Sequence, residues 1–215
     1  MMAKIIPTIL TNDEKEYHKR LLMAEHVSDL IQIDVIDGKF ADNTTIGTEI
    51  INKYPSSSDL EIQLMVINPQ NYVDDLMFTD HISRIIVPFE GELGLPEVVY
   101  HIKNHNKQVG LSLNPSTPLQ AAFHFLDDID LLLLLAVEPG FSGQKFQEKV
   151  VDKIKQIKKM VPTLAVEVDG GVNFETTPKL VEAGADFLAA NSVLYGAADF
   201  KVAFDKLERI AQAKT

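Results

Sequence analysis

Residues 164–192, LAVEVDGGVNFETTPKLVEAGADFLAANS, contain two short apolar runs, 164–169 and 187–190, on either side of a longer mixed stretch. The same alternation continues from the first residues of the chain to the last. Short apolar runs separated by stretches of helical period indicate repeated strand–helix units. Eight strands are predicted in this way, at residues 4–10, 30–36, 60–66, 84–88, 108–113, 131–137, 164–169 and 187–190.

Eight strands and about eight helices in 215 residues favour a closed (β/α)8 barrel, the TIM barrel of the α/β class, over a doubly wound open sheet. An open sheet usually carries G-x-G-x-x-G after its first strand, and residues 7–11, PTILT, offer nothing of the kind. No linker, low-complexity segment or charge block divides the chain, so residues 1–215 are predicted to form a single barrel domain. The chemistry is then expected where strands end and loops begin.

Composition excludes several classes of protein. The chain has no cysteine, which removes disulfide scaffolds, thiolate metal sites and cysteine nucleophiles. Its formal charge of −11 and the lack of a basic patch argue against a nucleic-acid partner. The most apolar run, 129–137, has about half of the roughly 20 residues that a membrane span requires, so no membrane partner is expected. Residues 1–10 lack the features of a signal peptide, and a cytoplasmic location is expected.

Two buried carboxylates are the first candidates for catalysis. Side chains alternate along a strand, so Gln32 and Asp34 share one face of the run 30–36. A carboxylate in an apolar strand is costly to bury unless it is paired, hydrogen-bonded or used in chemistry. Asp34 is therefore predicted to be catalytic, the alternative being a hydrogen-bonded Asp of the barrel interior. Asp169, at the end of the run 164–169, is the second candidate acid or base, and its alternative is an Asp-Gly turn.

The run 60–66, LEIQLMV, adds two side chains to the predicted site. Gln63 and Met65 lie on a common face of this strand, opposite Ile62 and Leu64. A second inward glutamine is unusual for a strand. Together with Gln32 it gives the predicted site two neutral amides.

Glycines and small polar residues gather after the last three predicted strands. Glycine lets backbone N–H groups approach an anion, and a short helix beginning at Ser192 would aim its first amides at the same point. Barrels frequently build a phosphate site from these last loops. The predicted phosphate-binding residues come from Gly140, Ser142, Gly143, Gly170, Gly171, Asn191 and Ser192.

Several motifs resemble the ribulose-phosphate 3-epimerase family over essentially the whole chain. The strings PGFSGQKF at 139–146 and EVDGGV at 167–172 are specific for that family among phosphate-binding barrels. The other matching segments are PTIL at 7–10, IDVIDG at 33–38, TIG at 45–47, LM at 64–65 and LNPSTP at 113–118.

The resemblance implies an enzyme of carbohydrate metabolism that interconverts ribulose 5-phosphate and xylulose 5-phosphate, two pentose phosphates, by moving a proton at C3. Asp34 and Asp169 match the two aspartates that act as acid and base on opposite faces of the substrate and also bind a divalent metal. A homo-oligomer is implied as well. The substrate-binding positions are taken as Thr8, Gln32, Gln63, Met65, Ser142, Gly143, Gly170, Gly171, Asn191 and Ser192.

The departures from the family pattern gather at the site. The family's other two metal ligands are histidines, and Gln32 and Gln63 stand at their positions. Zinc prefers nitrogen and sulfur ligands, so Asp34, Asp169, Gln32 and Gln63 suit Mg²⁺ or Mn²⁺ if they suit any ion. No organic cofactor is expected. Thr8 replaces the family's Ser, Ile36 its Met, Pro88 its fourth-strand His, and Ser142 and Asn191 two of its glycines.

Three functions are weighed against these residues. The first is an epimerase acting on ribulose 5-phosphate or on another ketose phosphate, whose turnover would be slow because an amide stabilises an enediolate less than a dication does. The second is a non-catalytic barrel that binds a sugar phosphate. The third, a decarboxylase of the orotidylate type, is not supported because its D-x-K-x-x-D string is absent at Asp34. The two retained aspartates favour the epimerase.

Overall fold

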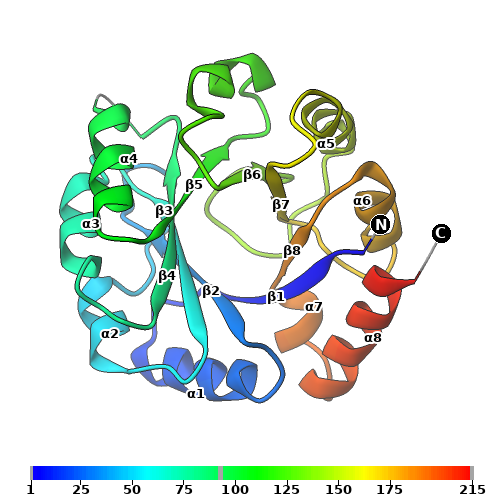
Figure 1. The fold of residues 1–215 in the computed structure, drawn as a ribbon. Coiled ribbons are helices and arrows are strands. Elements are labelled where there is room, and N and C mark those ends of the chain that lie inside the picture. Colours follow the sequence, from blue (N-terminus) through cyan, green and yellow to red (C-terminus); the bar gives the residue numbers. More distant parts are fainter. Residues whose placement is uncertain (1, 92–93, 214–215) are drawn as a thin grey trace.

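The computed structural model describes residues 2–91 and 94–213, and it contains a closed barrel of parallel strands in sequential order, β1 to β8 (Figure 1). This architecture confirms the predicted (β/α)8 fold. Each strand pairs with its neighbours in the sequence, and β1 closes the barrel against β8. The strands are β1 Lys4–Ile9, β2 Leu30–Ile36, β3 Asp59–Met65, β4 Ile82–Pro88, β5 Gln108–Leu113, β6 Leu131–Leu135, β7 Ala165–Asp169 and β8 Phe187–Ala190.

Helices surround the barrel (Figure 1). Each presents one apolar stripe to the strands, as α5 does with Val150, Ile154 and Ile157. The helices are α1 Glu14–Glu25, α2 Thr48–Lys53, α3 Gln70–Leu76, α4 Leu95–Asn104, α5 Lys149–Met160, α6 Thr177–Ala183, α7 Ser192–Tyr195 and α8 Phe200–Gln212, with a 3-10 helix at Leu119–Phe125 between β5 and β6. None of the helices in the described part of the chain is long and apolar enough to cross a membrane.

The core has two layers. The larger lies between the strands and the helices. The smaller fills the barrel interior with Ile86, Leu131, Leu133 and Leu135, against which Ala165 and Phe187 pack. Because side chains alternate along each strand, this inward set includes the polar positions of β2, β3 and β7.

Three charged side chains are also buried inside the barrel. Arg84 Nη1 donates to Glu61 Oε2 at 2.5 Å, and Glu167 Oε2 lies 3.9 Å from the same nitrogen. Burial, and then the charge of Glu61, raise the pKa of Glu167 well above its usual range. One arginine therefore faces two glutamates, and the raised pKa of Glu167 favours its protonated form.

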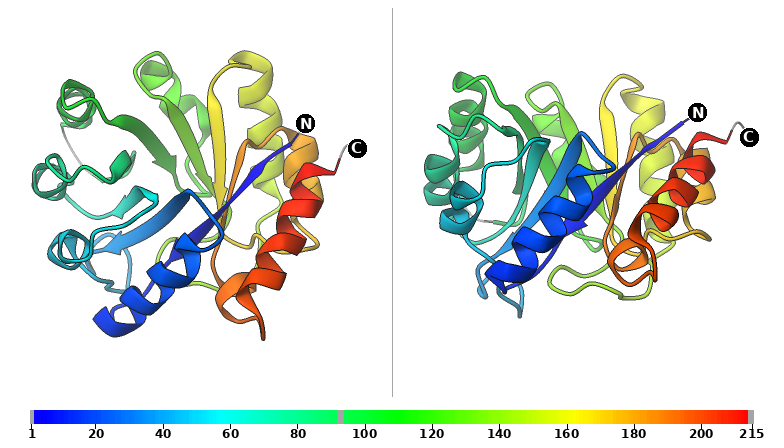
Figure 2. Two further views of the ribbon diagram at one scale, coloured as in Figure 1. Left: turned by 60° about the horizontal axis from the view of Figure 1, so that its bottom comes forward. Right: turned by 90° about the horizontal axis from the view of Figure 1, so that it is seen from below.

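All eight strands are parallel, so their carboxyl ends meet at one end of the barrel. Figure 2 (right) shows the loop between β6 and α5 and the short helix α7 at this end. The first strand and the last helix meet near the opposite end, where the Ala3 amide donates to the Ala211 carbonyl at 3.1 Å. The loops at the carboxyl ends are therefore the place to look for a site.

Candidate active site

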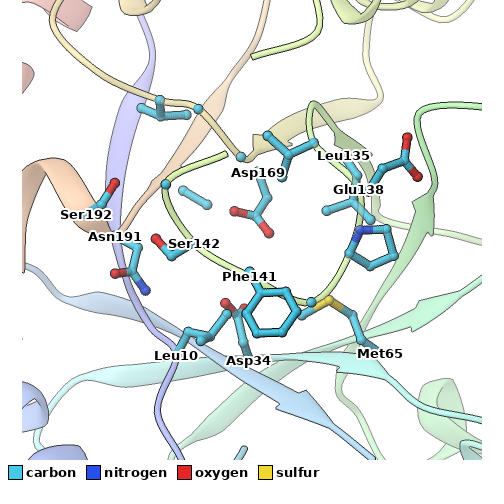
Figure 3. A pocket seen from close by; sticks show the side chains of 18 residues that line it. Leu10, Asp34, Met65, Leu135, Glu138, Phe141, Ser142, Asp169, Asn191 and Ser192 are labelled. Carbon is cyan, nitrogen blue, oxygen red and sulfur yellow. The ribbon is translucent and has the colours of Figure 1, made fainter. Parts of the chain in front are cut away.

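A pocket opens at the carboxyl ends of the strands, and Asp34 and Asp169 both line it (Figure 3). It is open to solvent and is lined by the loops that follow β6, β7 and β8. Three of its side chains are acidic, and no Lys, Arg or His is found among those described at its wall. The lining residues are Leu10, Asp34, Met65, Leu135, Val137, Glu138, Pro139, Gly140, Phe141, Ser142, Gly143, Asp169, Gly170, Gly171, Val172, Ala189, Asn191 and Ser192.

The pocket has two chemically different sides. Figure 3 shows Ser142, Asn191 and Ser192 on one side and Met65 on the other, with the carboxylates of Asp34 and Asp169 between them. The two carboxylates come from β2 and β7, and both point into the pocket. A ligand that spans the pocket would therefore have its middle atoms between two carboxyl groups.

Two glutamine amides lie beneath the pocket and connect the aspartates. Gln32 Nε2 donates to Asp34 Oδ1 at 2.8 Å and to Gln63 Oε1 at 2.7 Å. Rotating the Gln63 amide breaks the second of these bonds, because it sets Gln63 Nε2 2.7 Å from Gln32 Nε2, and it places the same nitrogen 2.9 Å from Asp169 Oδ2 and 3.2 Å from Asp34 Oδ1. The hydrogen-bonding pattern favours this second orientation because it puts an N–H group between two carboxylates. The β2–β3 register explains the contact, since Asp34 and Gln63 are directly paired.

Burial changes the acidity of both aspartates. Desolvation, and then the neighbouring Asp169 carboxylate, raise the pKa of Asp34 well above its usual range. Desolvation also raises the pKa of Asp169 to about 7, although the Gly170 amide and Gln63 oppose the shift by donating to the carboxylate. The raised pKa values bring both carboxyl groups closer to the range in which a carboxyl group can act as an acid or a base near neutral pH.

Glycines bring free amides to the polar side of the pocket. Gly143 and Gly171 have φ values of +80° and +67°, a conformation that other residues rarely adopt. Within residues 2–91 and 94–213, the amides of Gly143, Gly171 and Ser192 have no protein acceptor. Asn191 Nδ2 is likewise buried without a partner. The Gly170 amide, by contrast, donates to Asp169.

The side chains around the aspartates lack the nitrogen and sulfur ligands that zinc prefers. Gln32 turns its N–H group, which cannot bind a cation, toward Asp34. None of the six histidines lines the pocket. Among the described residues, no group of three or more His, Cys, Asp or Glu side chains has an arrangement that could hold an ion.

Residues 4–195 match the sequence model of the ribulose-phosphate 3-epimerase family. The chain belongs to this family. It is 39% identical to the ribulose-phosphate 3-epimerase of Bacillus subtilis (strain 168), an alignment that covers 96% of this chain and 98% of the relative. It is 34% identical to the ribulose-phosphate 3-epimerase of Methanocaldococcus jannaschii, with 98% and 92% of the two chains covered.

Solved structures with much lower sequence identity have the same fold. One is KGPDC from Streptococcus mutans, with a TM-score of 0.77, 12% identity and 98% of both chains covered. Another is 3-hexulose-6-phosphate synthase from Salmonella typhimurium, with a TM-score of 0.72, 19% identity, and 97% and 98% coverage. These similarities concern the barrel alone.

The structure separates the predicted site residues into two groups. One group lines the pocket with the two aspartates and consists of Met65, Ser142, Gly143, Gly170, Gly171, Asn191 and Ser192. The other group, Thr8, Gln32 and Gln63, is buried below the pocket. Gly140, which was also predicted for the phosphate site, lines the pocket as well. Sequence reasoning did not single out the other lining residues as ligand contacts. Phe141 and Glu138 could have been found, because they belong to the same glycine-containing run as Ser142.

Proposed function

We propose that this epimerase-family chain interconverts ribulose 5-phosphate and xylulose 5-phosphate, with one of Asp34 and Asp169 removing the proton from C3 and the other returning a different proton to the opposite face. The observation that carries the proposal is the pair of carboxyl groups, Asp34 buried and Asp169 partly buried, that face one pocket. Membership of the epimerase family supports the reaction class and the substrate. Ribulose 5-phosphate is therefore the first substrate to test, and other ketose phosphates are the alternatives.

The proposed reaction uses the two aspartates in opposite states. The ionised carboxylate removes the proton from C3, which leaves an enediolate with negative charge on the oxygen at C2. The protonated carboxyl group then delivers its proton to C3 from the other face, so one proton enters the enzyme and one leaves it. Their raised pKa values favour this arrangement at neutral pH.

The two glutamine amides supply the hydrogen-bond donors of this proposal. In the rotated orientation, Gln63 Nε2 lies 2.9 Å from the Asp169 carboxylate and 3.2 Å from the Asp34 carboxylate. Its N–H groups can therefore donate to whichever carboxylate is charged. Donor groups fixed in a buried site also stabilise an enediolate oxygen at little cost in reorganisation. The amides would act where a metal acts in a site with histidine ligands, and we propose that turnover requires no transition metal.

The phosphate group is assigned to the free amides of Gly143, Gly171 and Ser192, together with the Asn191 side chain. Backbone N–H groups provide a local positive potential, which allows an acidic chain to bind an anion without a basic side chain. This arrangement places the phosphate on the polar side of the pocket and C3 between the aspartates. The opposite end of the sugar then lies near Met65.

A barrel that only binds a sugar phosphate is the weaker alternative. Two buried carboxylates repel an anionic ligand and raise the cost of burial, and a binding protein gains nothing from them. They are useful where a proton is exchanged. We also expect a homo-oligomer in the cytoplasm, as the sequence motifs imply.

The proposal is tested by following the C3 proton in D₂O by NMR with ribulose 5-phosphate as substrate. We expect xylulose 5-phosphate to form with solvent deuterium at C3, and expect Asp34→Asn and Asp169→Asn each to reduce the rate by about 10²–10⁴-fold. Asp152→Asn, at an exposed position of α5, is the matched control. Parent-like rates in either active-site variant would mean that the two-aspartate assignment is wrong.

A further inference from the structure

The segment Val137 to Gly143, in the loop between β6 and α5, forms one wall of the pocket. Part of its shape is set within its own loop, because Gln144 Nε2 donates to the Glu138 carbonyl at 2.7 Å and to the Phe141 carbonyl at 2.9 Å. These bonds shape the segment but do not hold it against the rest of the barrel. Its start is fixed to β7, because the amide of the preceding residue, Ala136, donates to the Asp169 carbonyl at 2.7 Å. The position of its middle residues over the aspartates depends in addition on contacts with other loops.

One such contact comes from the loop between β2 and α2. Asn43 Nδ2 donates to the Gly140 carbonyl at 2.6 Å, across 97 positions of sequence. Among the described residues, this is the only side-chain hydrogen bond that joins segment 137–143 to another loop. The backbones also approach closely there, since a Cβ atom built on Gly140 would lie 3.3 Å from the Ala41 Cβ.

The loop that carries Asn43 is itself fastened to the strand of Asp34. Thr45 Oγ1 donates to the Asp34 carbonyl at 2.7 Å and accepts from the Ile36 amide at 2.8 Å. The Asn43 Oδ1 atom accepts from the Thr44 amide at 2.9 Å, which fixes the side chain with its N–H group toward Gly140. A short series of hydrogen bonds thus connects the backbone of Asp34 with the wall of the pocket.

We propose that Asn43 is a positioning residue that holds segment 137–143 over the bound sugar phosphate. The inference rests on the proposed function, because the segment carries the Gly143 amide that is assigned to the phosphate. Asn43 does not line the pocket and takes no part in proton transfer. Its loss should therefore weaken substrate binding and expose the segment while leaving the chemical step nearly unchanged.

Two substitutions remove the donor in different ways. Asn43→Asp is nearly isosteric and keeps the acceptor for the Thr44 amide, but it places an oxygen against the Gly140 carbonyl. Asn43→Ala removes the donor without adding charge. Asn52→Asp is the matched control, because Asn52 Nδ2 also donates to a backbone carbonyl, that of Asp75 at 3.0 Å, on an exposed surface away from the pocket.

The first measurement is the rate at which chymotrypsin cleaves after Phe141, whose side chain is 54% exposed. Both Asn43 variants should be cleaved several-fold faster than the parent protein, and Asn52→Asp should be cleaved at the parent rate. The second measurement is steady-state epimerisation of ribulose 5-phosphate. KM should rise about 3- to 10-fold in both Asn43 variants, the range expected for one hydrogen bond, with kcat within about twofold of the parent value.

The two measurements separate the inference from the function on which it rests. Parent-like cleavage in both Asn43 variants would overturn the role of Asn43, and so would a loss of kcat with KM unchanged. If the parent protein does not epimerise ribulose 5-phosphate, the proposed function fails. The cleavage rates then still decide whether Asn43 holds the segment.

Discussion

Replacing Asp169 by Asn should stabilise the protein at alkaline pH while it abolishes catalysis. The folded protein raises the pKa of this carboxyl group from 3.8 to about 7 through desolvation. Between these two values the unfolded chain releases the proton and the folded protein keeps it, so stability falls as pH rises. Above pH 7 the folded protein must bear the ionised Asp169 carboxylate, and this lowers its free energy of unfolding. At 1.4 kcal/mol per pH unit between the two pKa values, the loss is about 4 kcal/mol. Water in the open pocket screens part of this cost, and we expect about 2–4 kcal/mol.

Urea unfolding at pH 4 and pH 8 measures this effect. Asp169→Asn keeps an acceptor for the Gly170 amide but carries no charge, so it should be more stable than the parent by about 2–4 kcal/mol at pH 8. At pH 4, where the folded parent is protonated, the difference should fall below about 1 kcal/mol. Asp152→Asn should show no such pH-dependent gain. An equal stability difference at both pH values would refute the assignment of a costly buried charge to Asp169.

Other consequences of the site are open to direct measurement. The rate of epimerisation should follow a bell-shaped pH profile, rising as the first carboxyl group of the pair ionises and falling as the second one does. A rate independent of pH from 5 to 9 would contradict acid–base catalysis by the pair. Gln32→His combined with Gln63→His should recruit zinc or another transition metal, detected by elemental analysis, because two imidazoles then join two carboxylates. Gly171→Ala should weaken inhibition by inorganic phosphate by about tenfold or more. The new Cβ atom would lie 2.8 Å from the Phe146 Cβ, and position 171 has a positive φ that alanine rarely adopts. Unchanged inhibition would mean that the Gly171 amide does not bind the anion.

The strands could be predicted from sequence because each is a short apolar run bounded by polar or glycine residues. Helix starts were less well determined. The TNDE segment at 11–14 suggests a cap at Thr11, but the structure places it at Asp13, whose Oδ1 accepts from the Glu16 amide at 2.7 Å. Both residues are good caps, and tertiary packing of α1 decides between them. The Thr117-Pro118 start leads to a 3-10 helix, which no local signal distinguishes from an α-helix.

The candidate site was predictable residue by residue but not as an assembly. Strand alternation identifies Asp34, Gln32 and Gln63 as polar side chains of inward faces. That Gln63 reaches both aspartates depends on the stagger of β2, β3 and β7 in the closed barrel, which only the structure gives. The link from Asn43 to Gly140 spans 97 positions and leaves no pattern in either loop.

Epimerisation in the presence of a chelator tests the central claim most directly. The protein is purified, its zinc, manganese and iron are measured, and the conversion of ribulose 5-phosphate to xylulose 5-phosphate is followed before and after exhaustive treatment with EDTA. If two aspartates and two amides carry out the reaction, we expect less than one bound transition metal per ten chains and the same rate of epimerisation after chelation. One tightly held metal per chain, with activity that is lost on its removal and restored on its return, would contradict it.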